Sequence, residues 1–122
     1  MSTPAILIAE DDPVLRSLCE KKFILEGFSV RTAGDGEQTV RAIREQTPDL
    51  VLCDIHMPAM DGFQVLETFP KNTRSFPIVM LTNFDMAEFK LRALNLGADD
   101  YVVKKDMTMK TLVAMAKRML KL

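Results

Sequence analysis

Short apolar segments alternate five times along the chain with longer stretches of helical periodicity. The first segment, Ala5–Ala9, is continuously apolar, as expected for a central strand that is buried on both faces. The segment 28–32 alternates apolar and polar residues, which predicts an edge strand with one wet face. The predicted strands are 5–9, 28–32, 50–53, 78–81 and 101–103. Repeated βα units of this kind predict an α/β domain built around a parallel sheet.

Capping residues indicate the limits of the predicted helices. Asp12 and Pro13 supply an N-cap and a proline at the first helical position, and Gly27 is placed to end the same helix. The inward stripe of this helix is predicted to comprise Leu15, Leu18, Cys19 and Leu25. Four further helices are predicted. The first begins near residue 35 and stops before 47, the second runs through 65 and 66 and ends at Pro70, the third extends from about 86 to 96, and the last begins near 108.

Polar residues follow the apolar segments where the strands should end. Glu10 and Asp11 come after the first segment and Asp54 after the third, while Thr82 and Lys104 follow the fourth and fifth. The carboxyl ends of parallel strands share one edge of a sheet, where open α/β sheets bind their ligands. Each of these residues alone is more typical of a helix cap or a solvated charge. Their joint placement predicts a functional site.

Carboxylates gathered at this edge repel one another, because each ionised group raises the cost of ionising the next. A hard cation relieves the repulsion, and oxygen ligands around an open crevice suit Mg²⁺, which completes its shell with phosphate oxygens. Lys104 and Thr82 would then meet the remaining phosphoryl oxygens. The remaining role is a nucleophile, and a carboxylate such as Asp54 can accept a phosphoryl group as an aspartyl phosphate.

The composition is globular, and we expect residues 1–122 to form a single domain. Sixteen basic against seventeen acidic residues give a net charge of −1, so no overall field favours direct binding to nucleic acid. No apolar stretch is long enough for a membrane span and no signal peptide is recognisable, so we expect a cytoplasmic protein. Cys19 and Cys53 form no zinc motif and are expected to be buried, reduced thiols.

Several segments together form a specific pattern: Ile6–Pro13, Asp54 with Met57-Pro58 and Met60-Asp61-Gly62, Leu81-Thr82, Gly97–Tyr101 and Val102–Lys104. In these segments the chain resembles the receiver domains of two-component response regulators, over essentially its full length. The resemblance implies a flavodoxin-like, doubly wound α/β fold of five parallel strands in the order 2-1-3-4-5, with five helices.

The resemblance also implies a role for each acidic residue. Asp54 would be the phosphoacceptor. Mg²⁺ would be bound directly by Asp11, Asp54 and the backbone carbonyl of His56, and through water by Glu10. Asp12 would stay outside the metal shell, and the side chain of His56 would line the entrance of the site.

Other residues would bind and report the phosphoryl group. Thr82 would donate a hydrogen bond to it, Lys104 would pair with it, and Tyr101 would turn inward as Thr82 moves. The donor would be a histidine kinase or phosphotransfer protein, and the face of the fourth helix, fifth strand and fifth helix would bind a downstream protein or effector domain. The receiver would assist its own phosphorylation and dephosphorylation without being an enzyme. A homodimer through the same face is an open alternative.

Two residues near the site, Lys105 and Asn83, depart from the receiver pattern, and Phe84 lies next to one of them. Lys105 stands where receivers usually have a cis proline, so the loop either contains a non-proline cis bond, which costs roughly 2.5–4 kcal/mol, or runs trans. Asn83 should narrow access to the phosphoryl group, and Phe84 should shield it from water. Slow autodephosphorylation is therefore predicted.

Three other functions compete with this interpretation. A phosphatase or mutase of the aspartyl-phosphate type needs a second acid where His56 stands, and a flavodoxin needs a Ser/Thr/Gly-rich loop after the first strand. A degenerate receiver, which binds proteins without taking phosphate, stays open because of Lys105 and Asn83.

Overall fold

Five strands and five helices alternate along residues 3–122, the part of the chain that the computed structural model describes. The strands are β1 (Ala5–Ala9), β2 (Ser29–Ala33), β3 (Leu50–Asp54), β4 (Ile78–Thr82) and β5 (Asp100–Val103). The helices are α1 (Pro13–Leu25), α2 (Gly36–Glu45), α3 (Gly62–Thr68), α4 (Ala87–Asn95) and α5 (Met109–Met119), with 3₁₀ turns at Lys71–Thr73 and Lys104–Asp106. No helix within this described range is long and apolar enough to cross a membrane.

The strands form one parallel sheet in the order β2-β1-β3-β4-β5, which confirms the predicted flavodoxin-like topology. Ala9 lies opposite Cys53, and Asp54 lies opposite Leu81. The ends of β1, β3 and β4 are therefore staggered by only one residue from each strand to the next, and the residues that follow them emerge at one edge of the sheet. β2 is an edge strand, as its alternating pattern predicted.

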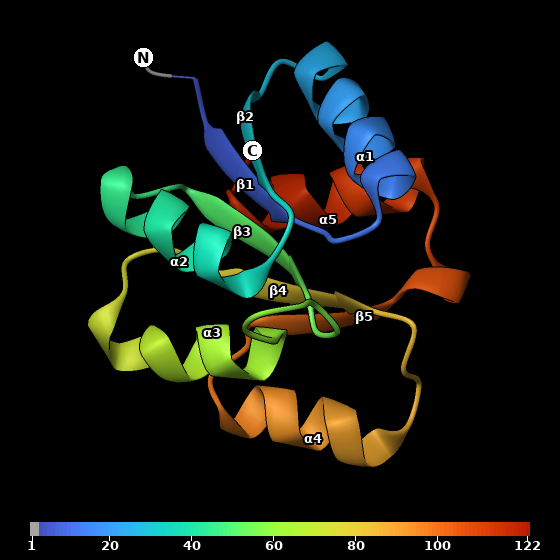
Figure 1. Ribbon diagram of the computed structural model, residues 1–122. Helices are drawn as coiled ribbons and strands as arrows, with labels where there is room; N and C mark the ends of the chain where they lie inside the picture. Colours follow the sequence, from blue (N-terminus) through green and yellow to red (C-terminus); the bar gives the residue numbers. More distant parts are fainter. Residues whose placement is uncertain (1–2) are drawn as a thin grey trace.

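Helices cover both faces of the sheet (Figure 1). One hydrophobic cluster packs α2, α3 and α4 on the sheet and contains Cys53, and the other packs α1 and α5 and contains Cys19. Both cysteines are buried free thiols, on opposite faces of the sheet. Burial raises the pKa of Cys19 to about 11 and that of Cys53 further still.

The inward face of α1 differs from the prediction. Cys19 is buried as expected, but Leu18 and Leu25 are 54% and 81% exposed, and the buried aromatic residue is Phe23. Phe23 lies four residues after Cys19 and so shares its side of the helix, whereas Leu18 and Leu25 fall about 100° or more away from Cys19. The predicted stripe was centred wrongly because it left out Phe23.

A buried guanidinium fixes the C-terminal end of α4. Arg74, in the loop before β4, donates hydrogen bonds to the carbonyls of Phe69, Phe76 and Gly97 at 2.7, 2.9 and 2.5 Å. It also pairs with Asp99 at 2.7 Å. At the N-terminal end of α4 the N-cap residue, Met86, makes no side-chain capping hydrogen bond.

Candidate functional site

Three carboxylates converge at the edge of the sheet where the strands end. Glu10 and Asp11 directly follow β1, and Asp54 is the last residue of β3. One carboxylate oxygen from each lies within 4.8 Å of the others. Glu10 and Asp54 are buried and Asp11 is exposed. The structure thus brings together the three acids that the strand ends indicated.

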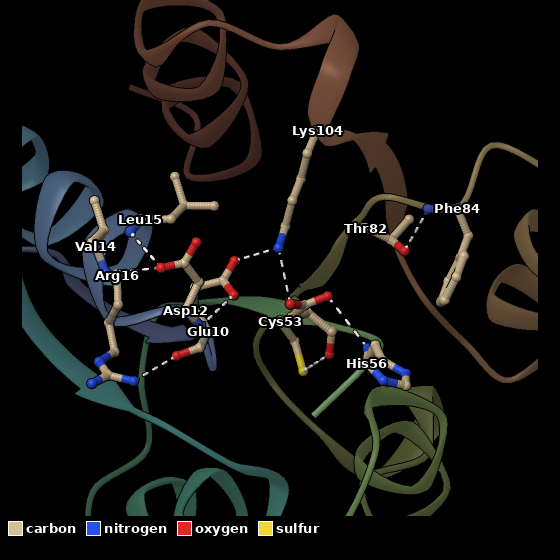
Figure 2. A network of polar contacts seen from close by, with 11 residues as sticks. Glu10, Asp12, Val14, Leu15, Arg16, Cys53, His56, Thr82, Phe84 and Lys104 are labelled. Carbon is tan, nitrogen blue, oxygen red and sulfur yellow. Dashed lines mark hydrogen bonds and ion pairs between the residues drawn. The ribbon is translucent and has the colours of Figure 1, made fainter. Parts of the chain in front are cut away.

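Lys104 extends from the end of β5 into this acidic cluster (Figure 2). Its ammonium lies 2.5 Å from Oε1 of Glu10 and 2.9 Å from Oδ2 of Asp54. All peptide bonds in the described range are trans. Of the two possibilities for the bond between Lys104 and Lys105, cis or trans, the structure therefore has the trans form. Lys104 thus reaches the acidic cluster although Lys105 stands where the receiver pattern has a proline.

Burial and mutual contact shift the protonation of these groups. Burial raises the pKa of Glu10 to about 7; contacts with Lys104 and the backbone N–H of Asp12 oppose this rise, and Asp54 adds to it. For Lys104, burial alone would lower the pKa, but its contacts with Glu10 and Asp54 outweigh this effect and raise it. Lys104 is therefore a charged ammonium, and Glu10 keeps its proton to a higher pH than an ordinary glutamic acid does.

The donor set fits a hard divalent cation. Oε1 of Glu10 is buried and, although it touches the ammonium of Lys104, it accepts no well-directed hydrogen bond from any described residue. Asp11 and Asp54 supply further carboxylate oxygens beside it. Oxygen-only donors around an open crevice are typical of Mg²⁺ sites. Asp12 is outside this cluster, because its side chain caps α1 by accepting from the N–H of Val14 at 2.9 Å.

The loop after β4 is tied to Thr82 and Tyr101. The buried Thr82 hydroxyl oxygen accepts from the N–H of Phe84 at 3.0 Å, and the hydroxyl of Tyr101 donates to the carbonyl of Phe84 at 2.7 Å. Tyr101 is 9% exposed, so it already lies inward in this structure. Both candidate switch residues therefore hold the backbone of Phe84, one through its N–H and the other through its carbonyl.

The acids open into a cavity of about 810 Å³. Its lining includes the acidic cluster, Thr82, Lys104, Asn83, Phe84 and His56. The ring of His56 packs edge-on against Phe84, with 6.0 Å between ring centroids, and its backbone N–H donates to Oδ1 of Asp54 at 3.3 Å. His56 thus lines the entrance, where the sequence placed it.

Two contacts around the site were not foreseen from the sequence. Arg16 of α1 donates to the carbonyl of Glu10 at 2.9 Å and so holds the loop that carries the acids (Figure 2). A cation near the N-terminus of a helix interacts unfavourably with the helix dipole. The position of Arg16 in the first turn of α1 is therefore a sequence signal that its side chain has a specific partner. Lys105 pairs with Asp85 at 2.5 Å across the rim of the cavity. No pattern in the sequence marks that pair, because its members follow different strands.

Comparison with known proteins agrees with this geometry. The family model described as response regulator receiver domain matches residues 6–117. The chain is 36% identical over 99 residues to the probable transcriptional regulatory protein TcrX of Mycobacterium tuberculosis, covering 81% of this chain and 42% of TcrX. The chain therefore spans less than half the length of that regulator.

Solved structures are similar over almost the whole chain. The receiver domain of the Francisella response regulator 1452 has a TM-score of 0.91 at 28% identity, covering 98% of each chain. The beryllofluoride-activated receiver domain of Klebsiella pneumoniae RstA has a TM-score of 0.88 at 29% identity, covering 97% of this chain and 99% of that one. Both carry the fold described here.

Proposed function

The chain belongs to the response-regulator receiver family of two-component signalling, and from this premise we propose that Asp54 accepts a phosphoryl group from a histidine kinase or phosphotransfer protein. The observation that carries the proposal is the position of Asp54 at the base of the cavity, 2.9 Å from the ammonium of Lys104 and beside Glu10 and Asp11. A buried carboxylate between a cation and a metal-binding set is suited to nucleophilic attack on phosphorus.

In the proposed reaction a carboxylate oxygen of Asp54 bonds to phosphorus while the phosphorus–nitrogen bond of the phosphohistidine breaks. The imidazole leaves with the electron pair and takes up a proton. Lys104 pairs with the phosphoryl oxygens as negative charge moves toward Asp54. Mg²⁺ held by Glu10, Asp11, Asp54 and the carbonyl of His56 would supply further positive charge beside those oxygens. The chain would assist this transfer and also the later attack of water on phosphorus, which breaks the bond to Asp54 and releases inorganic phosphate; its role is that of a switch rather than of an enzyme.

The proposed output is a shift between two states of the loop after β4. The phosphoryl group attracts the hydroxyl of Thr82, which at present accepts from the N–H of Phe84. A change at Phe84 is passed to Tyr101, whose hydroxyl donates to the carbonyl of the same residue. The face of α4, β5 and α5 then binds a downstream protein or effector domain in the cytoplasm, or a second copy of the chain. Direct contact with nucleic acid is not part of the proposal.

The intact mass of the protein after incubation with acetyl phosphate tests the phosphoacceptor. We expect a phosphoryl adduct that requires Mg²⁺ and that is absent from Asp54→Asn. A protein that forms no adduct and also fails to bind beryllofluoride with Mg²⁺ would support the phosphate-independent interaction module instead. An adduct that persists in Asp54→Asn would place the acceptor elsewhere.

A further inference from the structure

Two loops flank the mouth of the cavity, and one ion pair joins them. Residues 83–86 connect β4 to α4, and residues 104–108 connect β5 to α5. Nζ of Lys105, in the second loop, lies 2.5 Å from Oδ2 of Asp85 in the first. The two side chains are 63% and 54% exposed, so the pair lies at the rim of the cavity rather than inside it.

The local backbone explains why Lys105 reaches Asp85. Lys104 and Lys105 are consecutive residues of a 3₁₀ turn, in which neighbouring side chains diverge by about 120°. Because Lys104 points into the acidic cluster, Lys105 is directed sideways toward the other loop. A proline at position 105 would carry no ammonium and could not make this contact.

The pair fixes the residue next to Phe84. The backbone of Phe84 is already held by Thr82 and by Tyr101. Its ring lines the cavity and stacks on Phe89 of α4 with 4.9 Å between ring centroids. Lys105 also lines the cavity. The Lys105–Asp85 pair thus adds a side-chain tie, from the opposite loop, to a segment that carries the aromatic lip of the site.

We propose that the Lys105–Asp85 pair is a latch across the mouth of the cavity, and that Lys105 is a positioning residue for the reaction at Asp54. The inference rests on the proposed function of Asp54. With the latch closed, Phe84 stays over the cavity, and both the phosphoryl donor and water reach Asp54 less often. Breaking the latch speeds phosphorylation by small donors and hydrolysis of the aspartyl phosphate together. Because the pair is exposed, the expected change is roughly two- to fivefold, and salt weakens it.

Charge reversal separates the latch from a direct effect of the Lys105 charge on the anionic donor. The variants are Lys105→Asp, Asp85→Lys and the double variant that exchanges the two residues. The measurements are the rate of adduct formation with acetyl phosphate and the phosphoryl half-life, at low and high salt. Each single variant should shorten the half-life roughly two- to fivefold, and the double variant should restore it. High salt should shorten the half-life of the unmodified protein and lengthen that of the single variants, because it screens the attraction in the first and the repulsion between like charges in the others.

Two results of the half-life measurements would overturn the latch. One is a double variant that behaves like Lys105→Asp alone, since Lys105 would then act through its own charge. The other is a set of half-lives that do not differ from that of the unmodified protein. Amide hydrogen exchange of residues 83–86 in the unphosphorylated protein provides a readout that does not depend on Asp54. Exchange should be faster in both single variants and restored in the double variant; equal exchange in all four proteins would reject the latch even if no adduct formed.

Discussion

The ammonium of Lys104 lies between the carboxylates of Glu10 and Asp54, at 2.5 and 2.9 Å. In the absence of metal, Lys104 is therefore the cation that offsets the charge of the acidic cluster. A divalent cation bound by the same acids competes with it for these oxygens. The same side chain is therefore expected to have opposite effects on the proposed metal binding and on the proposed phosphoryl transfer.

Replacing Lys104 with Met should tighten Mg²⁺ binding and slow phosphorylation. Without the ammonium the cluster is more negative, so the affinity for Mg²⁺ should rise roughly tenfold. The rate of adduct formation at saturating Mg²⁺ should fall on the order of a hundredfold, because the charge that meets the phosphoryl oxygens is lost. Isothermal titration and intact mass measure the two effects. The matched control is Lys110→Met, which removes an exposed lysine and should leave both quantities unchanged. An unchanged Mg²⁺ affinity in Lys104→Met would contradict the prediction.

The metal-free protein should lose stability as the pH rises from about 4.5 to about 7. In this window native Glu10, with a pKa of about 7, holds a proton that the unfolded chain, at 4.5, has released. Its contribution is complete below the lower value and is lost as the pH passes the higher one. The expected loss in the free energy of unfolding is on the order of 2 kcal/mol. Urea unfolding in a chelator across this range measures it.

A matched variant and added metal check the origin of that pH dependence. Glu10→Gln should flatten the profile, because its amide does not titrate. Saturating Mg²⁺ should also flatten it, since the metal favours the ionised carboxylate. A Glu10→Gln profile as steep as that of the unmodified protein would assign the dependence to another group.

Replacing Phe84 with Ala should shorten the phosphoryl half-life. The Phe84 ring lines the cavity and packs against His56, so its removal widens the path by which water reaches Asp54. We expect a change of roughly threefold to tenfold in the hydrolysis rate, the range for about 1 kcal/mol of barrier. Phe84→Leu, which keeps most of the apolar bulk, should give a smaller effect. A half-life that is unchanged in Phe84→Ala would remove the shielding role.

Replacing Arg74 with Met should destabilise the protein by about 3 kcal/mol, because it leaves buried carbonyls without their donor and removes the buried cation beside Asp99. Arg74→Lys should recover less than half of this loss, since an ammonium cannot reproduce the fork of the guanidinium. Lys71 pairs with the same aspartate at 3.2 Å but is 63% exposed, so Lys71→Met should change stability by less than about 1 kcal/mol. Denaturant unfolding of the three variants at neutral pH provides the comparison.

The strands and the converging acids could be predicted because their signals are local. Continuous apolar runs mark strands that are buried on both faces, and in a parallel sheet each run ends at the same edge. The positions of Asp54 and Thr82 could be predicted without any information on contacts between distant segments. The limits of the helices followed from caps such as Asp12 and Gly27, the latter with a φ of 94°.

The remaining features depend on contacts between distant segments. Arg74 reads as a solvated loop residue until Gly97 and Asp99 are placed beside it. Lys105 and Asp85 follow different strands. Lys105 is directed toward Asp85 by the 3₁₀ turn in which it lies, and the sequence does not predict that turn. The prediction of which face of α1 is buried was wrong for another reason. The helix carries apolar residues on several sides, so its sequence alone does not show which side packs on the sheet.

The burial of both cysteines has a practical consequence for spectroscopic work. The thiolate is the species that reacts with maleimides, and the native thiols are at most 1% exposed, with pKa values far above neutral. A cysteine introduced at an exposed position, such as Leu91 on α4, would be the site that a label modifies in the folded protein. The natural sequence is therefore a ready background for attaching fluorophores or spin labels that follow α4 during signalling.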